Sequence, residues 1–261
     1  MVDYVLLEVI NHGSFGVVYK ARDNATGEIV AIKEELRGLS DSTKMEIQIL
    51  DSLRPHPNIV EFKKVVLDGS DVFVVMEHVE SDLEKLREEL GKPFPPKLVK
   101  TLIFEILKGV AFLHENGVMH RDLKPANVLY GGEGRVKICD FGLSARVGSL
   151  WGRGVGTRIY KAPESLVEWE GCTGKVDIWS VGCMMAQFVL DAPIFQGRSD
   201  DHQLECIRAG LWGRTNVIGV VMSDTRLGES GLDLLKRLLA YYPWERISAR
   251  DALVHPWFTK E

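Results

Sequence analysis

The sequence predicts an α+β protein of two lobes, a small antiparallel β lobe with one helix followed by a larger, mainly α-helical lobe. Five β-rich runs separated by Gly, Asn, Asp or Pro fill the first 80 residues, whereas helical patterns dominate after about Glu80. We find no internal repeat and no Pro- or Gly/Ser-rich linker in the 261 residues. We therefore expect one domain over 1–261, with a small lobe at 1–79, a large lobe at 80–261 and a ligand clamped between them.

The small lobe is predicted from side-chain period and turn residues. One helix, from about Ser42 to Leu53, has apolar residues at 3.6-like spacing and a proline just past its end. Thr26-Gly27 supplies the turn between the second and third strands. The predicted strands are Tyr4 to Ile10, Val17 to Asp23, Ile29 to Lys33, Phe62 to Leu67 and Val72 to Glu77.

The large lobe is predicted from longer apolar periodicities. A helix begins after the Pro95-Pro96 pair, and two short strands, Val128 to Tyr130 and Val136 to Cys139, follow it. Residues 201–232 read as a connection between two helices. The predicted helices are Lys97 to Glu115, Gly174 to Leu190, Gly231 to Leu239 and Ala249 to Val254.

Composition excludes several classes of function. The formal charge is −5 and no long basic run is present, so we expect neither nucleic acid nor an acidic membrane as a partner. The four cysteines have no metal-site or disulfide-framework spacing, which favours a reducing, intracellular setting in the cytoplasm or nucleus. We expect no signal peptide and no membrane span, because the longest apolar stretch, Val181 to Leu190, is short and contains Gln187.

A glycine turn joins the first two predicted strands. The segment Ile10 to Val18 carries glycines at positions 13 and 16, and such a turn lets backbone N–H groups approach phosphates without interference from a Cβ atom. Glycines are equally common in ordinary hairpins, so the segment alone predicts only a turn.

A lysine ends the third strand, in the run Val30-Ala31-Ile32-Lys33, and Glu46 lies on the inward side of the next helix. A lysine held by a helix glutamate is the arrangement that fixes an ammonium against the α- and β-phosphates of a nucleotide. Glu34, Glu35 and Glu46 are also consistent with solvated surface charges, so the pair alone leaves both interpretations open.

The segment His120 to Asn127 (HRDLKPAN) places a carboxylate, an ammonium and a carboxamide in one loop. Asp122 can orient a hydroxyl and accept its proton, Lys124 can neutralise a transferred phosphoryl group, and Asn127 can hold Mg²⁺. Asp140, in the run Asp140-Phe141-Gly142 after a short strand, supplies a second oxygen ligand for that ion.

In this order, the glycine turn, VAIK, the helix glutamate, HRDLKPAN, DFG and Ala162-Pro163-Glu164 resemble the signature motifs of the eukaryotic protein kinase catalytic domain. The resemblance covers essentially the whole chain. It implies a bilobal kinase fold, transfer of the γ-phosphate of Mg-ATP to Ser/Thr hydroxyls of protein substrates, and catalytic roles for Asp122, Lys124, Lys33 and Glu46. Asn127 and Asp140 would hold the metal.

The resemblance also implies a set of nucleotide contacts. Backbone groups of Glu77 and Val79 would bind adenine, Asp82 would meet the ribose, and Met76 would close the rear of the pocket. Asp177 would brace the HRD loop and Arg246 would pair with Glu164, both as structural support. The remaining contacts would come from Ile10, Asn11, His12, Gly13, Ser14, Phe15, Gly16, Val18, Ala31 and Leu129, together with Lys33.

The chain looks most like the cyclin-dependent kinases and their relatives, and it departs from them at several places. Asn11 replaces the first loop glycine, and Phe15 replaces the inhibitory tyrosine. The family's activating threonine falls at Gly152, which leaves Ser144, Ser149 or another group to meet Arg121.

Three further departures concern partners and substrates. The helix entering Glu46 is unlike the family's cyclin-docking sequence, so a cyclin-like activator is an open expectation. The short stretch from Asp201 to Leu232 disfavours a small suppressor-type partner there, and Lys161 stands where the family's preference for proline after the acceptor needs an arginine.

Two further hypotheses are weighed against an active kinase. The altered glycine turn and the missing threonine favour a pseudokinase scaffold that binds nucleotide or protein partners, whereas the intact Lys33, Asp122, Asn127 and Asp140 oppose it. A metabolite kinase would lack the Ala162-Pro163-Glu164 platform.

Overall fold

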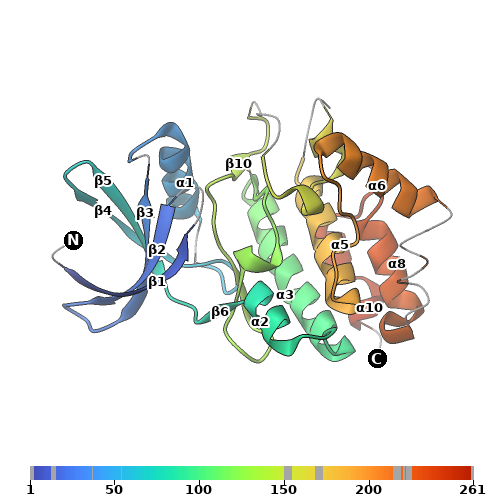
Figure 1. Cartoon of the computed structure of the whole chain (residues 1–261), viewed down its shortest axis with the longest axis horizontal. Coiled ribbons are helices and arrows are strands. Elements are labelled where there is room, and N and C mark those ends of the chain that lie inside the picture. The colour runs from blue at the N-terminus through green and yellow to red at the C-terminus, as the bar shows by residue number, and fades with distance from the viewer. Residues whose placement is uncertain are drawn as a thin grey trace.

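The computed structural model describes residues 3–12, 16–36, 38–53, 55–149, 155–167, 173–213, 219, 221 and 225–259. A β-sheet with one helix beside it forms one end of the molecule, and helices form the other end (Figure 1). The predicted fold class is therefore confirmed. Among the described residues, no helix combines the length and the apolar character needed to cross a bilayer.

The small lobe is built on a five-stranded sheet in the order β1-β2-β3-β5-β4, in which every neighbouring pair is antiparallel. The predicted turn at Gly27 is present: Gly27 has a φ of 74° and its N–H donates to the Asp23 carbonyl at 2.8 Å. The strand bounds lie within two residues of the predicted ones and are β1 (Tyr4–His12), β2 (Gly16–Asp23), β3 (Ile29–Glu35), β4 (Phe62–Asp68) and β5 (Asp71–Glu77).

Alternation along β3 separates a core face from a site face, because successive side chains of a strand point in opposite directions. Val30 and Ile32 are buried in the core of the sheet with Ala21, Phe73 and Val75. Ala31, Lys33 and Glu35 therefore leave the strand on its other face. This register puts the strand lysine toward helix α1.

Helix α1 (Asp41–Ser52) packs beside the sheet (Figure 1). Its start is set by Ser40, whose hydroxyl accepts the Thr43 N–H at 3.2 Å and satisfies one of the free amides of the first turn. Ile49 and Leu50 are buried on its inner face. The helix thus anchors one apolar stripe in the core and presents Glu46 to β3.

Over the described residues, the large lobe contains the helices predicted after Glu80 and four that were not, α2, α4, α6 and α10. Helix α2 is short and charged, and it depends on the Asp82 side chain that caps it. The prediction that residues 201–232 form a connection is wrong for the first part of this stretch, which belongs to helix α6. Ser199 caps the start of α6, and Leu204 and Ile207 are buried on the helix. The bounds are α2 (Leu83–Leu90), α3 (Pro96–Glu115), α4 (Pro163–Leu166), α5 (Lys175–Leu190), α6 (Asp200–Trp212), α8 (Gly228–Leu238), α9 (Ala249–Leu253) and α10 (Pro256–Thr259).

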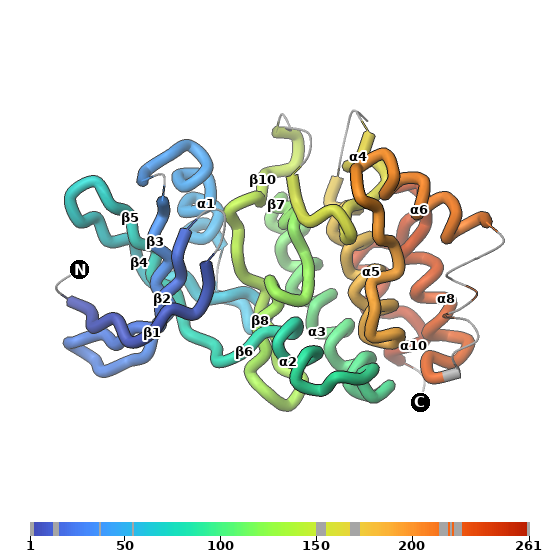
Figure 2. Tube along the Cα trace, in the orientation of Figure 1, coloured from blue at the N-terminus to red at the C-terminus, as the bar shows by residue number. Residues whose placement is uncertain are grey.

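Two small sheets lie between the large sheet and the helical body (Figure 2). One pairs β6 (Ser81–Asp82) with β8 (Val128–Tyr130) and β8 with β9 (Val136–Ile138). The other pairs β7 (Val118–Met119) with β10 (Ala145–Arg146). The HRD segment follows β7 and the DFG segment follows β9, so these short pairings bring the two loops together.

Candidate active site

The lysine of β3 and the glutamate of α1 form a closed ion pair. Lys33 Nζ lies 2.7 Å from Glu46 Oε2, 2.8 Å from Glu35 Oε1 and 3.7 Å from Asp140 Oδ1. Lys33 and Glu46 are both buried, which excludes the interpretation of Lys33 and Glu46 as solvated surface charges.

Burial and neighbouring charges shift both pKa values of this pair. Burial lowers the pKa of Lys33, but the carboxylates of Glu46, Asp140 and Glu35 outweigh it and raise the pKa above the ordinary value. Burial raises the pKa of Glu46 to about 7, against the opposing effect of Lys33. Lys33 is therefore a fixed cation, and Glu46 is the group that titrates near neutrality.

The HRD loop holds Asp122 in a network of hydrogen bonds. Lys124 Nζ donates to Asp122 Oδ2 at 2.9 Å, and Asn127 Nδ2 donates to the Asp122 carbonyl at 2.8 Å and to Oδ2 at 3.2 Å. Asp122 is only 8% exposed. Its carboxylate is thus aimed by side chains two and five residues along the same loop.

Thr157 supplies two more hydrogen bonds to Asp122 from the segment that follows the DFG motif. Its N–H and its hydroxyl each donate to Asp122 Oδ1 at 2.7 Å, and Lys124 Nζ donates to its Oγ1 at 3.1 Å. Gly156 has a φ of 91°, and a Cβ atom there would lie 2.5 Å from the Arg121 carbonyl oxygen. The sequence did not predict this contact between Thr157 and Asp122.

Asp177, on helix α5, holds the backbone of the HRD loop, as predicted. Its carboxylate accepts the backbone N–H groups of His120 and Arg121 at 2.9 and 2.8 Å and contacts His114 Nε2 at 2.9 Å. Burial raises the pKa of Asp177, but these hydrogen bonds more than offset the effect and lower it. Arg121 is held at a φ of 72°, a strained conformation that this anchor stabilises.

The DFG segment is joined to the HRD loop through its backbone. Cys139 N–H donates to the Asn127 carbonyl at 3.0 Å, and the Cys139 carbonyl contacts His120 Nε2 at 2.8 Å. Phe141 is buried, with its ring 5.2 Å from the His120 ring. Asp140 follows Cys139 directly with a φ of 63°, which turns its side chain toward Lys33.

Asn127 and Asp140 suit a Mg²⁺ ion that also binds phosphate. Both amide hydrogens of Asn127 are directed at Asp122, and no described residue donates to its Oδ1. The Asp140 side chain is 36% exposed. No cluster of three or more His, Cys, Asp or Glu within the described ranges could hold a metal ion by itself. Such a donor set fits Mg²⁺, which takes one or two protein oxygens and completes its shell from phosphate and water.

Four of the residues expected around the base lie on β2, β3, β5 and β8, and the one expected at the ribose lies on β6. Val18, Ala31 and Leu129 are partly buried, and Met76 is 9% exposed. Asp82 caps α2, because its Oδ1 accepts the N–H groups of Glu84 and Lys85 at 3.0 and 2.9 Å. The structure gives Asp82 a role that sequence reasoning missed, and its ribose contact stays a prediction.

The nucleotide-loop predictions fall partly outside the described residues. Gly13, Ser14 and Phe15 lie outside them, as does Gly152. Asn11 pairs with Val18 after a register shift in β1 that includes Ile10. Strand β1 ends at His12 and β2 begins at Gly16, so these two residues flank the loop. Of the two proposed phosphate acceptors, Ser144 is buried and donates to the His120 carbonyl at 3.3 Å, whereas Ser149 is partly exposed.

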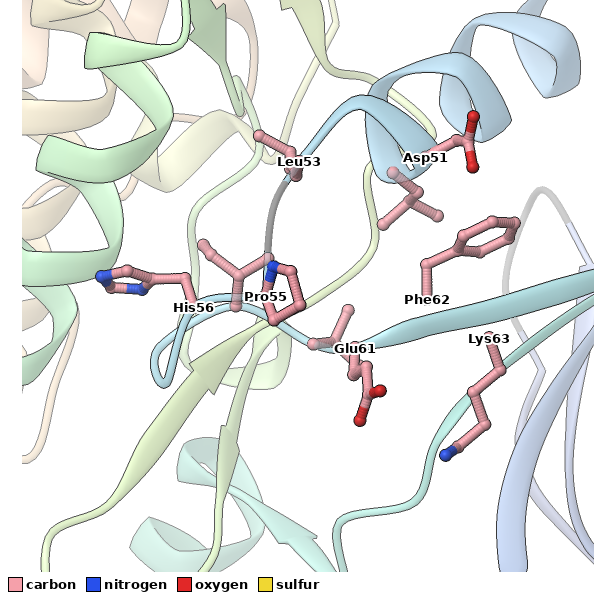
Figure 3. Close-up of a pocket in the computed structure, with 10 residues that line it drawn as sticks. Asp51, Leu53, Pro55, His56, Glu61, Phe62 and Lys63 are labelled. Carbon is pink, nitrogen blue, oxygen red and sulfur yellow. The ribbon is translucent and has the colours of Figure 1, made fainter.

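A pocket of about 200 Å³ lies elsewhere, where α1 ends and β4 begins (Figure 3). Leu53, His56 and Phe62 are among its lining residues, and none of the predicted site residues lines it. We assign no part of the candidate active site to it.

The Ala162-Pro163-Glu164 run is held in place by a buried ion pair that the sequence predicts. Arg246 donates to Glu164 through Nη1 at 2.6 Å and Nη2 at 3.0 Å, and it is 1% exposed. Further donors of the same guanidinium go to the carbonyls of Ala240, Lys175 and Tyr241. This pairing connects α4 to the segment before α9.

A sheet lobe and a helical lobe that bring a lysine, two aspartates and an asparagine together define a phosphotransferase of the bilobal class. The chain matches the protein kinase domain over residues 4–258 and belongs to that family.

Curated relatives carry the names of cyclin-dependent kinases. Cyclin-dependent kinase G-1 of Oryza sativa subsp. indica is 38% identical over 294 residues, covering 98% of this chain and 42% of the relative. Cyclin-dependent kinase 11 of Dictyostelium discoideum is 39% identical over 283 residues, covering 97% of this chain and 79% of the relative. Cyclin-dependent kinase 11B of Mus musculus is 35% identical over 288 residues, covering 98% and 37%. The chain thus spans less than half the length of two of these three relatives.

Proposed function

We propose that this chain is an ATP-dependent protein kinase that transfers the γ-phosphate of Mg-ATP to Ser or Thr hydroxyls of protein substrates. The observation that carries the proposal is the connected set of polar groups: Lys33 contacts Glu46 and approaches Asp140, and Asn127 joins the loop of Asp140 to Asp122. These are the groups that phosphoryl transfer requires, and none of them is missing.

Each residue has a separate role in the proposed reaction. Asp122 orients the acceptor hydroxyl and takes its proton, and Lys124 places a positive charge beside the transferred phosphoryl group. Lys33, held by Glu46, aligns the nucleotide through its α- and β-phosphates. When Mg²⁺ is held by Asn127 and Asp140, it neutralises charge on the phosphates.

The surroundings of Asp122 support a hydroxyl as the acceptor. Thr157 already donates its hydroxyl to Asp122 Oδ1, while Lys124 contacts Oδ2. The carboxylate therefore accepts an alcohol in the geometry that a Ser or Thr side chain of a substrate needs. Peptide binding is assigned to the segment ending at Glu164, which the pair with Arg246 holds in place.

A pseudokinase scaffold remains the alternative, and no described contact favours it. The closed Lys33–Glu46 pair and the buried Phe141 argue instead for a site competent to bind nucleotide. An intracellular location, in cytoplasm or nucleus, and a cyclin-like partner are parts of the proposal that rest on the names of the relatives. Because the Lys33–Glu46 pair is already closed in the chain itself, we do not assign the closing of this pair to the partner.

The test is transfer of labelled γ-phosphate from Mg-ATP to a generic basic protein substrate by the purified chain. Asp122→Asn should lower kcat by about 10²- to 10⁴-fold and leave nucleotide binding intact. Asp201→Asn, an exposed aspartate on α6, serves as the matched control and should have no effect. If the wild type and Asp122→Asn phosphorylate equally poorly while both bind Mg-ATP, the enzyme proposal fails and the scaffold proposal takes its place.

A further inference from the structure

Glu35 is a second carboxylate beside Lys33, the lysine proposed to bind the nucleotide. From the sequence alone, Glu35 is also consistent with a solvated surface charge. It follows Lys33 by two residues on β3, so both side chains leave the same face of the strand. Glu35 is only 6% exposed. The Oε1 atom of Glu35 is buried, and its contact with Lys33 Nζ at 2.8 Å does not have hydrogen-bond geometry. The positive charge of Lys33 nevertheless compensates the negative charge of Glu35.

The other oxygen of Glu35 reaches helix α1. Thr43 donates its hydroxyl to Glu35 Oε2 at 3.1 Å, and Thr43 is 2% exposed. Thr43 precedes Glu46 by three residues, so both lie on one face of the helix. The same hydroxyl lies 2.9 Å from the hydroxyl of the capping residue Ser40.

Strand β3 and helix α1 therefore touch through two polar contacts. One joins Lys33 to Glu46, and the other joins Glu35 to Thr43. The contacts are separated by about 4.5 Å along the helix axis, given the rise per residue of an α-helix. A helix held by one contact can rotate about that contact, whereas two contacts on one face of the helix prevent this rotation.

The charges around Lys33 explain why this second contact is stable. A buried carboxylate is costly unless it is paired, and Lys33 faces the three carboxylates of Glu35, Glu46 and Asp140. Glu35 lies beside the first turn of α1, where the helix dipole favours a negative charge. The charge of Glu35 also adds to the raised pKa of Glu46.

We propose that Glu35 and Thr43 are positioning residues whose hydrogen bond holds α1 in place, so that Glu46 stays on Lys33 without a partner protein pressing on the helix. The inference rests on the proposed function, because it concerns the alignment of the nucleotide lysine. It assigns regulation of this site to a contact within the chain.

The test compares Thr43→Val, which removes the hydroxyl at constant shape, with Thr43→Ser, which keeps it, in the isolated chain. We expect Thr43→Val to lower kcat/KM for ATP about tenfold, mainly through KM, with Thr43→Ser close to wild type. Glu35→Gln keeps an acceptor but removes the charge, so it should retain activity. The fall in kcat/KM at acidic pH that protonation of Glu46 causes, the acidic limb of the pH profile, should move to lower pH, because the Glu35 charge raises the pKa of Glu46. A role in folding alone would not move that limb.

Hydrogen exchange of residues 41–52 gives a second readout that does not depend on activity. The first turn of α1 should exchange faster in Thr43→Val than in wild type, and Thr43→Ser should restore protection. If Thr43→Val matches Thr43→Ser in both kinetics and exchange, the inference is overturned. If the wild type transfers no phosphate, the proposed function fails, and the exchange comparison still decides whether this contact holds α1. Glu35→Leu provides the same comparison if Thr43→Val does not fold.

Discussion

The hydroxyl of Thr157 donates to Asp122 Oδ1 at 2.7 Å, across a separation of 35 residues. Lys124 lies between them, donating to Asp122 Oδ2 and to the Thr157 hydroxyl. The orientation of the proposed base is thus set both by its own loop and by the segment before the Ala162-Pro163-Glu164 run.

Thr157→Ala should lower kcat about 10- to 100-fold, because the carboxylate of Asp122 loses a donor that orients it and a small misplacement of a reacting group is costly. Thr157→Ser keeps the hydroxyl and should retain most of the activity. The measurement is steady-state phosphorylation of a generic substrate at saturating ATP. Equal losses in the two variants would show that the methyl group, and not the hydroxyl, matters.

Gly156→Ala should abolish most of the activity. A Cβ atom at this position would lie 2.5 Å from the Arg121 carbonyl oxygen, so the HRD loop or the Thr157 segment must move. Gly117→Ala is the matched control, since Gly117 also has a positive φ, 68°, but has no atom within 4 Å of an added Cβ. Both variants should lose about 1–2 kcal/mol in free energy of unfolding from backbone strain. Comparable activity in the two variants would contradict the steric explanation.

Protonation of Glu46 should set the acidic limb of the pH profile. Because burial raises the pKa of Glu46 to about 7, kcat/KM for ATP should fall as the pH drops through neutrality and Glu46 loses its charge. Glu46→Gln should have a low activity without this limb. The measurement is kcat/KM for ATP between pH 5.5 and 8.5, with a pH-jump control for enzyme integrity.

Protonation of Glu46 should have opposite effects on activity and on stability, because it lowers kcat/KM but raises the free energy of unfolding. The folded pKa of Glu46 lies above its ordinary value of 4.5, so the folded state binds the extra proton between about pH 4.5 and 7. Its contribution to the free energy of unfolding is therefore fully present below this window and falls as the pH rises, by at most about 3 kcal/mol. Urea unfolding across this range should show the slope in the wild type and not in Glu46→Gln.

Glu164→Gln should lower the free energy of unfolding by about 3–5 kcal/mol, because it leaves the buried Arg246 guanidinium without its charged partner. The control is Arg237→Ala, which removes an exposed pair with Asp233 and should cost less than about 1 kcal/mol. Chemical denaturation measures both. A loss at Glu164 no larger than that of the surface pair would mean that Arg246 is satisfied by backbone carbonyls alone.

The strands, the principal helices and the order of the functional groups could be predicted because they depend on local features. The face on which Lys33 leaves β3 follows from a period of two, and the start of α3 follows from the Pro95-Pro96 pair. Helices α2 and α6 escaped prediction because α2 is short and charged and both depend on their capping side chains and on packing. The start of α6 inside residues 201–232 is the clearest example.

For the candidate site, the structure connects five residues that the sequence predicts, and it adds two neighbours that the sequence does not predict. The five are Lys33, Glu46, Asp122, Asn127 and Asp140. No sequence pattern links Thr157 to Asp122, and the sequence leaves open whether Glu35 is a surface charge, whereas the structure places both beside site residues. A spacing of two residues from Lys33 was a usable signal for Glu35, since it predicts the same strand face. No comparable local signal relates Thr157 to Asp122.

By itself, the sequence determined which chemical groups the protein carries and the element on which each of them lies, because period, turns and caps act over a few residues. Only the tertiary structure decided which groups meet: that Lys33 is shared among Glu35, Glu46 and Asp140, and that Thr157 reaches Asp122. The physical reason is that these contacts form between segments that burial of a common core brings together, and the energy of a charged contact depends on how completely that core excludes water.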